Sequence, residues 1–458
     1  MNAPAPLNLA LQETDVVLLE RRLAASAPHE EGAFFLLREG RGAEGRRLLA
    51  CEMLPSPPGA WERQGRGELR PSARHLSAMI SAAASAGCGL LFVHSHPDAG
   101  HPIGLSPIDV SSLRDLAATI CPLLEGPFAA AVVHEVGWGG ALVGAEGLEP
   151  IRSIVSVGRG LRFLSPPPAL SDGEEALDTR QRDALGAAHE RLRTLSVAVV
   201  GAGGLGSPLA EQLVRMGVAK LILIDDDVLD TESNARRVFG TRRSDVVGAS
   251  PAPKADVVAA HLRGLGLGTE VVAVVRDVTA QDTFGHLLDV DLVFGATDTH
   301  SSRAVLNDLP STYLLPVVDL GVRVGNRAGG ALAGLVAEVR LLTPERPCLW
   351  CRELLDPDAI RAENLPAPER RALQREGYLM GSVGAPVPSV AALTVLGSAM
   401  GACTLLGLLT GEGEELPSGW IVDGLLGDAF ESGQGLPDPD CRCRAQLARG
   451  DDSPPPLR

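Results

Sequence analysis

The stretch LSVAVVGAGGLGSPLAEQLVRMGVAKLILIDDD, residues 195–227, decides the fold class of this 458-residue chain. An apolar run is followed by a glycine-rich turn, then by a helical pattern, and then by a second apolar run that ends in three aspartates. Strand and helix patterns in alternation predict right-handed crossover units and a parallel sheet. Glycines between a strand and a helix let the backbone approach a phosphate closely, and the helix N-terminus favours its negative charge. The stretch therefore predicts a nucleotide-binding α/β domain.

A proline-rich segment separates this domain from an N-terminal module. The alternation continues through KADVVAAHLRGLG and TEVVAVV, so we expect a Rossmann-like domain over residues 179–447. The segment RFLSPPPALSDGEEALD predicts a solvated linker, bounded at 160–178. Before it, GAFFLL, GLLFVHSH and PFAAAVVHEV predict short strands, and ARHLSAMISAAASAG predicts a helix, all within a first domain at 15–155. The tail RGDDSPPPLR is expected to be disordered.

Composition and charge exclude two classes of partner. The N-terminus lacks a basic flank and an apolar core, and we expect no apolar run of the roughly 18 residues that span a bilayer. The formal net charge is −16 at pH 7, whereas nucleic-acid binding depends on many lysines and arginines. We therefore expect a cytoplasmic protein with neither a membrane nor a nucleic-acid partner.

A metal-ligand pattern lies in VHSHPDAGHPIGLSPIDV, residues 93–110. His94 and His96 occupy positions i and i+2 of an apolar strand and so share one face, and Asp109 could add an oxygen ligand. Three protein ligands leave the fourth zinc position to water, as in catalytic sites. A general base is then needed, and Glu30 or Glu31 at the mouth of the first strand could supply it. An isolated HxH pair, by contrast, is more often packed or merely exposed.

The combination of HSHP with the following LSPID resembles the motif of the JAMM (MPN-type) zinc metalloproteases, over roughly residues 15–150. The resemblance implies an α+β domain in which His94, His96 and Asp109 bind a catalytic zinc ion. It also makes Ser106 the hydrogen-bond donor to the tetrahedral oxyanion and a remote glutamate the base. Members of the family cleave amide bonds that follow ubiquitin or ubiquitin-like proteins, or trim such proteins behind their terminal glycines.

Two details of this motif depart from the family pattern. The family usually has glycine where this chain has Ala33, and the spacing to that position favours Glu30 over Glu31 as the base. The stretch between His96 and Ser106 is two residues longer than usual and contains His101. It represents either a loop insertion or a competing ligand.

A second resemblance concerns the domain predicted at residues 179–447. The order of SNARR, residues 233–237, of PAPKADVVAAHL, and of GATDTHSSR, residues 295–303, resembles the ubiquitin-activating and ThiF-type adenylyltransferases. That family joins a carboxylate to AMP with ATP and magnesium, and it also serves thiamine and molybdenum-cofactor synthesis. A dinucleotide dehydrogenase would share the glycine pattern but has no role for the other two segments.

The second resemblance implies specific nucleotide contacts. The glycine turn would approach the phosphates, Asp225 or Asp227 would hold the ribose hydroxyls, Asn234, Arg237 and Lys254 would face the phosphates, and Asp298 would hold Mg²⁺. The turn consists of Gly201, Gly203, Gly204 and Gly206. The spacing departs from the family by one extra residue before Asn234 and by about four before Lys254.

Arg180 lies in LDTRQRDALG, which resembles the entry helix of the same family. In that family such an arginine reaches the nucleotide of a partner protomer, so the resemblance implies a homodimer.

Eight cysteines include two close pairs, Cys348 with Cys351 and Cys441 with Cys443. In a cytosolic chain such pairs indicate metal ligands rather than disulfides, and the four thiolates could close a tetrahedral structural zinc site. Conjugating members of the family carry a thioester cysteine between the two pairs, where this chain has only Cys403. Its surroundings are rich in alanine and leucine and predict a buried helix, and burial raises the pKa of a thiol and hides it. Adenylation is thus better supported than thioester transfer.

Together the two resemblances predict one bifunctional enzyme of the kind found in bacterial ubiquitin-like systems. One site would hydrolyse the amide after a glycine-ended ubiquitin-like tail, and the other would activate the exposed carboxylate, with a conjugating enzyme as a possible further partner. One alternative is activation of a sulfur-carrier protein for thiocarboxylate formation. The other is a catalytically inactive scaffold that binds a ubiquitin-like partner.

Overall fold

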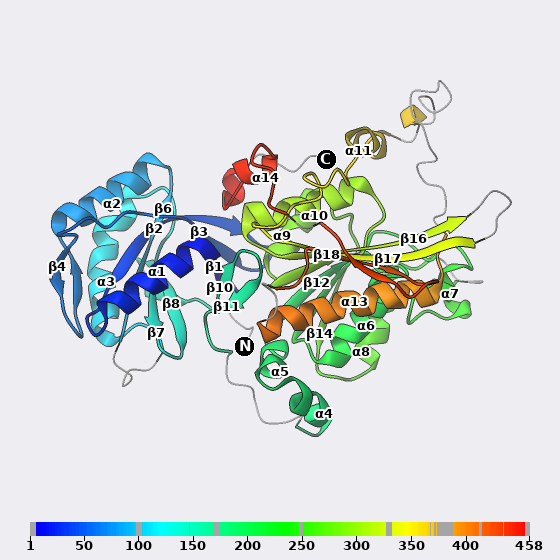
Figure 1. The fold of residues 1–458 in the computed structure, drawn as a ribbon, viewed down its shortest axis with the longest axis horizontal. Helices are drawn as coiled ribbons and strands as arrows, with labels where there is room; N and C mark the ends of the chain where they lie inside the picture. The colour runs from blue at the N-terminus through cyan, green and yellow to red at the C-terminus, as the bar shows by residue number, and fades with distance from the viewer. Residues whose placement is uncertain are drawn as a thin grey trace. The chain divides into compact units, whose positions relative to one another are not determined.

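The computed structural model describes residues 6–97, 103–145, 147–167, 175–246, 251–326, 332–366, 368–370, 372, 388–411, 415–433 and 435–453. The chain forms two compact units. The N-terminal unit comprises Met1–Pro167, Ser311–Leu314 and Gln446–Pro454, and the C-terminal unit comprises Pro168–Pro310, Leu315–Ala445 and Pro455–Arg458. Each unit contains one large sheet with helices packed against it (Figure 1).

The N-terminal unit is built on a nine-stranded mixed sheet in the order β11-β10-β1-β3-β2-β6-β7-β8-β9, with β4 and β5 as a separate hairpin. Its elements are β1 (Leu7–Gln12), α1 (Glu13–Ser26), β2 (Gly32–Arg41), β3 (Arg46–Met53), β4 (Trp61–Gln64), β5 (Leu69–Pro71), α2 (Ala73–Ser85), β6 (Gly89–Ser95), α3 (Pro107–Ile120), β7 (Phe128–His134), β8 (Gly137–Gly144), β9 (Gly147–Pro150), β10 (Ser153–Val157) and β11 (Leu161–Phe163).

Helices cover both faces of this sheet because consecutive strand residues point to opposite sides. Phe35 of β2 packs with Leu19 of α1 in one core, whereas its neighbour Phe34 packs with Met79 of α2 and Leu113 of α3 in the other. The predicted strands and helix are therefore present. Strand β6, which carries the histidine pair, lies between β2 and β7 inside the sheet.

The C-terminal unit has an eight-stranded sheet in the order β14-β13-β12-β15-β16-β17-β18-β19. Its elements are α4 (Glu175–Leu185), α5 (Ala187–Leu192), β12 (Ser196–Val200), α6 (Gly206–Met216), β13 (Lys220–Ile224), α7 (Asn234–Arg237), α8 (Lys254–Gly264), β14 (Glu270–Val274), α9 (Gln281–Leu288), β15 (Leu292–Gly295), α10 (His300–Tyr313), β16 (Val317–Asn326), β17 (Leu332–Leu342), α11 (Pro357–Glu363), α13 (Ala391–Thr410), β18 (Gly419–Asp423), β19 (Ala429–Glu431) and α14 (Arg442–Ala445).

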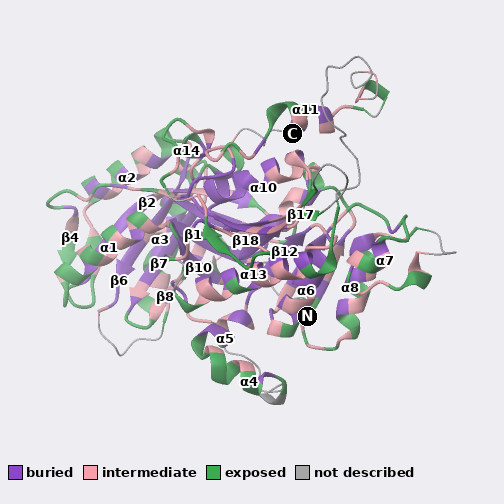
Figure 2. Ribbon diagram, turned by 45° about the vertical axis from the view of Figure 1, so that its right-hand side comes forward, coloured by how far each residue is buried: buried purple, intermediate pink, exposed green. Residues whose placement is uncertain are grey.

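The predicted parallel sheet is confirmed for the strands from β14 to β16, which pair in parallel. Beyond β16 the pairing is antiparallel, so the sheet as a whole is mixed. Buried residues concentrate in the strands, and exposed residues lie on the outer helix faces (Figure 2). The apolar run of β12 is buried because it occupies the centre of the parallel part.

Two sequence expectations about the C-terminal third were wrong. Helix α13 is long and apolar enough to cross a membrane by length and composition, although half of its most apolar window is buried within the protein, as in a core helix. The start of the tail is also ordered, because Gly450–Asp452 form a 3₁₀ turn and Asp451 accepts a hydrogen bond from the Arg41 backbone at 3.0 Å. Residues 454–458 lie outside the described part of the chain.

Candidate functional site

A cavity of about 510 Å³ lies at the carboxyl ends of the parallel strands of the C-terminal unit. Strand β12 pairs with β13 on one side and β15 on the other, so the strand order reverses beside β12. α/β folds bind their ligands at such a switch point, and the volume suits a small molecule. The cavity brings together most of the predicted nucleotide contacts, namely Gly201, Gly203, Gly204, Asp225, Asp227, Arg237, Lys254 and Asp298.

The turn between β12 and α6 requires glycine at two positions. Gly201 has a φ of +97°, and a Cβ there would lie 2.6 Å from the carbonyl oxygen of Ala296. A Cβ on Gly206 would lie 1.7 Å from the carbonyl oxygen of Gly201. Gly206 does not line the cavity; it allows the tight turn with which α6 begins. Gly203, Gly204 and Leu205, which immediately precede α6, line the cavity, so this turn is the part of the backbone that a phosphate can approach.

The structure separates the two aspartates that the sequence left as alternatives for the ribose. Asp225 accepts hydrogen bonds from Ala202 N at 2.6 Å and from Asp227 N at 2.8 Å, and it thereby fixes the glycine turn. Burial raises the pKa of Asp225 to about 6. Asp227 is exposed and directs its carboxylate to Lys254 Nζ, 2.5 Å away. Both aspartates line the cavity; Asp225 is tied to the glycine turn, and Asp227 is the more exposed of the two.

Arg237 lines the cavity, but Asn234 does not. Asn234 is 1% exposed, and its Oδ1 accepts a hydrogen bond from the Arg237 guanidinium at 3.2 Å. Of these two residues, both expected to face the phosphates, only Arg237 reaches the cavity wall. Asn234 instead lies beneath the cavity wall and orients the Arg237 guanidinium through this hydrogen bond.

Asp298 follows β15 and is exposed at the wall of the cavity. Sequence reasoning missed Arg276, Asp277 and Arg303, which also line it. The first two follow β14, whose carboxyl end meets the same edge of the sheet, so strand order could have indicated them. The Arg303 guanidinium donates hydrogen bonds to Oδ1 and Oδ2 of Asp319, at 3.0 and 2.7 Å. No pattern in the sequence indicates this pairing.

Arg180 is not among the residues that line the cavity. It is exposed on α4, in a structure that contains one chain. Its predicted contact with a partner protomer therefore stays a prediction.

In the N-terminal unit, the carboxylate of Asp109 lies close to both His94 and His96, with one oxygen facing each imidazole. His94 Nε2 lies 3.2 Å from Asp109 Oδ1, and His96 Nε2 lies 3.3 Å from Asp109 Oδ2. Ligand atoms around a tetrahedral zinc ion are about 3.3 Å apart, because each lies at roughly 2.0–2.1 Å from the metal. Burial alone would raise the pKa of Asp109, but hydrogen bonds from the two imidazoles hold it far below its usual range. The residues present fit a zinc ion.

The remaining motif residues surround this cluster. Glu30 is 5% exposed, and a carboxylate oxygen of Glu30 lies within 4.8 Å of the ligand nitrogens of both histidines. Ser106 caps α3, where its Oγ accepts a hydrogen bond from Asp109 N and its own N–H donates to Asp109 Oδ2. The Ser106 hydroxyl keeps its proton for another acceptor. Glu31 is not part of the metal-ligand group within the described residues. His101 lies outside those residues.

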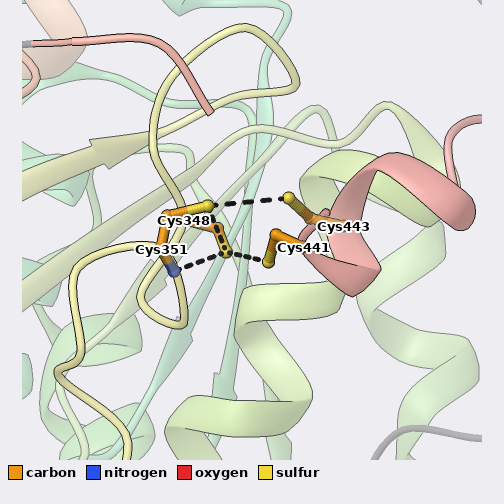
Figure 3. Close-up of side chains that lie close together, drawn as sticks. All are labelled: Cys348, Cys351, Cys441 and Cys443. Carbon is orange, nitrogen blue, oxygen red and sulfur yellow. Dashed lines mark hydrogen bonds between the residues drawn. The ribbon is translucent and has the colours of Figure 1, made fainter. Parts of the chain in front are cut away.

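Four cysteines form a second cluster, in the C-terminal unit (Figure 3). The Sγ of Cys348 lies 3.5 Å from that of Cys351 and 3.7 Å from that of Cys441, and the Cys351 and Cys443 sulfurs are 3.9 Å apart. Four thiolates around zinc are separated by about 3.8 Å, because each Zn–S bond is roughly 2.3 Å. A hydrogen bond from Cys443 lowers the pKa of the Cys348 thiol, which favours the thiolate form that binds zinc. The CxC pair therefore closes the same cage as a CxxC pair would.

The prediction that Cys403 is buried was wrong. Cys403 lies on α13 and is exposed, because it falls on the solvent side of a helix whose other face packs in the core. Helix α13 is apolar on both sides, so its composition did not reveal which side is buried. Thr394 of the same helix lines the cavity, and nine residues of helix separate it from Cys403 by about 13 Å. No cysteine lines the cavity within the described chain.

Comparison with known proteins agrees with this geometry. The ThiF family model matches residues 179–443. The SAMP-activating enzyme E1 of Haloferax volcanii is 30% identical over 55% of this chain and 80% of its own length. The ubiquitin-like modifier-activating enzyme 5 of Aedes aegypti is 29% identical over 47% of this chain and 52% of its own length. The chain therefore spans about half of that relative.

Among solved structures, E. coli MccB is similar at 14% identity with a TM-score of 0.45, over 63% of this chain and 75% of that chain. The family assignment depends on the sequence matches, which cover the glycine turn, the cavity and the cysteine cage. This chain belongs to the ThiF family of E1-like adenylyltransferases.

Proposed function

We propose that the protein activates the C-terminal carboxylate of a small glycine-ended protein, of the ubiquitin-like or sulfur-carrier type, by adenylation. The observation that carries the proposal is the cavity that joins the glycine turn, Arg237, Lys254 and Asp298 at the strand edge. A flexible glycine-ended tail is the natural substrate because its carboxylate must reach the α-phosphate inside a cavity. The names of the ThiF-family relatives support a ubiquitin-like protein as that substrate.

The residues suit adenylyl transfer. A carboxylate oxygen of the substrate attacks the α-phosphorus of ATP, the bond to the β-phosphate oxygen breaks, and pyrophosphate leaves with that electron pair. Arg237 and Lys254 offset the charge that accumulates at the phosphates, and Asp227 orients the ribose. Asp298 is the residue that would hold Mg²⁺, which supplies further positive charge at the phosphates.

We propose, as a second activity, that the N-terminal unit is a JAMM-type metallohydrolase acting on the amide after the same kind of tail. His94, His96 and Asp109 would hold a zinc ion, which supplies Lewis acidity to the site. Glu30 accepts the proton of the attacking water and later passes it to the leaving amine, while the Ser106 hydroxyl donates to the oxyanion. Hydrolysis exposes the carboxylate that the adenylation site uses, so the two sites share a substrate.

Sulfur-carrier activation is a second candidate for the adenylation site. It is favoured by the cavity wall, which has no cysteine among its described residues, and by the distance of Cys403 along α13. Sulfide would then attack the acyl carbon of the adenylate and AMP would leave, giving a thiocarboxylate. Formation of a reductant-labile carrier adduct on the protein would argue for the conjugating version instead, with a conjugating enzyme as the next partner.

We propose two further properties, a cytoplasmic location and a homodimeric assembly. All eight cysteines are free, as expected in the reducing cytoplasm. Arg180 is exposed on α4, where the flank of a second copy could meet it in a homodimer.

The test of adenylation is ATP–pyrophosphate exchange by the full chain, with a small protein ending in Gly-Gly as the substrate. We expect exchange that depends on this protein, at least 100-fold reduced in Asp298→Asn and unchanged in Asp358→Asn, which alters an exposed carboxylate on α11. Absence of exchange in the wild type, with the nucleotide still bound, would favour the inactive scaffold.

A further inference from the structure

Glu31, the residue after the general base, forms a buried hydrogen-bonding hub that the metal site does not use. It is 7% exposed. Its Oε1 accepts hydrogen bonds from Arg22 at 2.5 Å, from Trp61 Nε1 at 2.8 Å and from the Gly32 backbone at 3.0 Å. Five donors in all meet this one carboxylate, since Oε2 accepts from Gln64 at 2.9 Å and from Ser26 at 3.3 Å.

These donors come from separate elements of the N-terminal unit. Arg22 and Ser26 belong to α1, and Trp61 and Gln64 belong to β4. The carboxylate therefore ties the start of β2 to a helix on one side and to the β4–β5 hairpin on the other. Loss of a buried carboxylate with this many partners is costly, because buried donors such as Trp61 Nε1 would lose their acceptor.

The backbone of the same residue is fixed to the strand that carries the histidines. Ser95, which lies between His94 and His96, has its Oγ 3.1 Å from Glu31 N and 3.3 Å from Glu31 O. The Ser95 N–H donates to Glu31 O at 2.9 Å. The preceding peptide is held as well, because Glu30 N donates to Gly65 O at 2.7 Å and Gln64 Nε2 donates to Glu30 O at 3.1 Å.

We propose that Glu31 and Ser95 are positioning residues that fix Glu30 relative to the metal ligands. The inference rests on the proposed metallohydrolase activity. The backbone N–H and C=O of both Glu30 and Glu31 are hydrogen-bonded, which restricts movement of Glu30 relative to β6. A general base must lie within about 3 Å of the proton it accepts, and a misplacement of about 1 Å costs on the order of 100-fold in rate.

The test measures hydrolysis by the full chain of a peptide that ends in Gly-Gly and carries a C-terminal aminocoumarin, with zinc content determined on the same samples. We expect Glu31→Ala to lower kcat at least 10-fold, while KM stays within about twofold and the zinc bound at the histidine site is unchanged. Glu31→Gln keeps an acceptor for Arg22, Trp61 and the Gly32 backbone, and it should restore kcat to within about threefold of wild type. Glu39→Gln, at the other end of β2, is the matched control and should change nothing.

Ser95→Ala gives a second measurement where Glu31→Ala fails to fold. It removes the hydroxyl contact and leaves the backbone bond between β2 and β6, so kcat should fall about 3- to 10-fold at unchanged zinc content. Loss of zinc in parallel with activity, or wild-type kcat in both Glu31→Ala and Ser95→Ala, would overturn the positioning role. If wild type lacks zinc-dependent hydrolysis, or if Glu30→Gln hydrolyses normally, it is the proposed metallohydrolase that fails.

Discussion

Lys254 Nζ lies 2.5 Å from Asp227 Oδ2 at the wall of the cavity in the C-terminal unit. Lys254 is one of only two lysines in the chain and is 5% exposed, whereas Asp227 faces solvent. The pair holds a compact positive charge beside the glycine turn before any nucleotide is bound. In the proposed adenylation, Asp227 would turn to the ribose, and the ammonium would then be available to phosphate oxygens.

Replacing Lys254 with methionine should reduce ATP–pyrophosphate exchange by about 100-fold or more, because the charge at the phosphates is lost while the length of the side chain is kept. The other lysine, Lys220, pairs with Glu270 at the opposite end of β13, so Lys220→Met is the matched control and should exchange normally. Equal activity in Lys254→Met and wild type would remove this lysine from the site.

The pKa of Asp225, which burial raises to about 6, makes stability depend on pH. Between about pH 4 and pH 6 the folded protein holds a proton on Asp225 that the unfolded chain has released, so the contribution of this group to stability falls as pH rises and is constant above about 6. The asparagine in the Asp225→Asn variant has no carboxyl group that titrates in this pH range. Urea titrations give the free energy of unfolding of each protein. The wild-type value minus the Asp225→Asn value should therefore fall by up to about 3 kcal/mol between about pH 4 and pH 6.5. A pH-independent difference would contradict the raised pKa.

The cysteine cage should hold one zinc ion that survives dialysis against a weak chelator, because closed thiolate sites exchange slowly. Cys348→Ser should lose this zinc and lower the free energy of unfolding by at least about 2 kcal/mol. Cys121→Ser alters a thiol outside the cage and should keep the zinc. Zinc counted by mass spectrometry of the native protein decides the matter, and full zinc content in Cys348→Ser would exclude this cage.

Cys403→Ala should leave ATP–pyrophosphate exchange unchanged and should cost no more than about 1 kcal/mol of stability, because the thiol is exposed and lies about 13 Å along α13 from the cavity. Its exposure also makes a direct test of thioester chemistry possible. A reductant-labile carrier adduct that forms on wild type and disappears in Cys403→Ala would show that α13 moves during the reaction.

The sequence predicted features that depend on local pattern. Gly201 and Gly206 could be predicted because a strand–turn–helix with close backbone contact tolerates no side chain there. His94 and His96 could be predicted to share a face because they are two residues apart on a strand, and β6 has that geometry. The cysteine pairs could be predicted as metal ligands because the close spacing within each pair is typical of them.

The sequence could not predict features that depend on tertiary packing. Asp225, and not Asp227, is tied to the glycine turn because it accepts hydrogen bonds from backbone N–H groups that the folded turn brings together. The burial of Asn234 and the exposure of Cys403 depend likewise on which side of each helix packs. The order of the tail at Asp451 depends on Arg41, about 400 residues earlier in the chain.

The most direct test of the central claim, two separate chemistries on one glycine-ended tail, is to measure both activities on the same full-length variants. With the Gly-Gly aminocoumarin peptide and the Gly-Gly-ended protein as substrates, Glu30→Gln should lose zinc-dependent hydrolysis by at least about 100-fold and keep ATP–pyrophosphate exchange. Asp298→Asn should show the reverse pattern, since it would remove the proposed magnesium ligand from the C-terminal unit alone. Loss of both activities in either variant at native stability, or hydrolysis that persists in Glu30→Gln, would contradict the account.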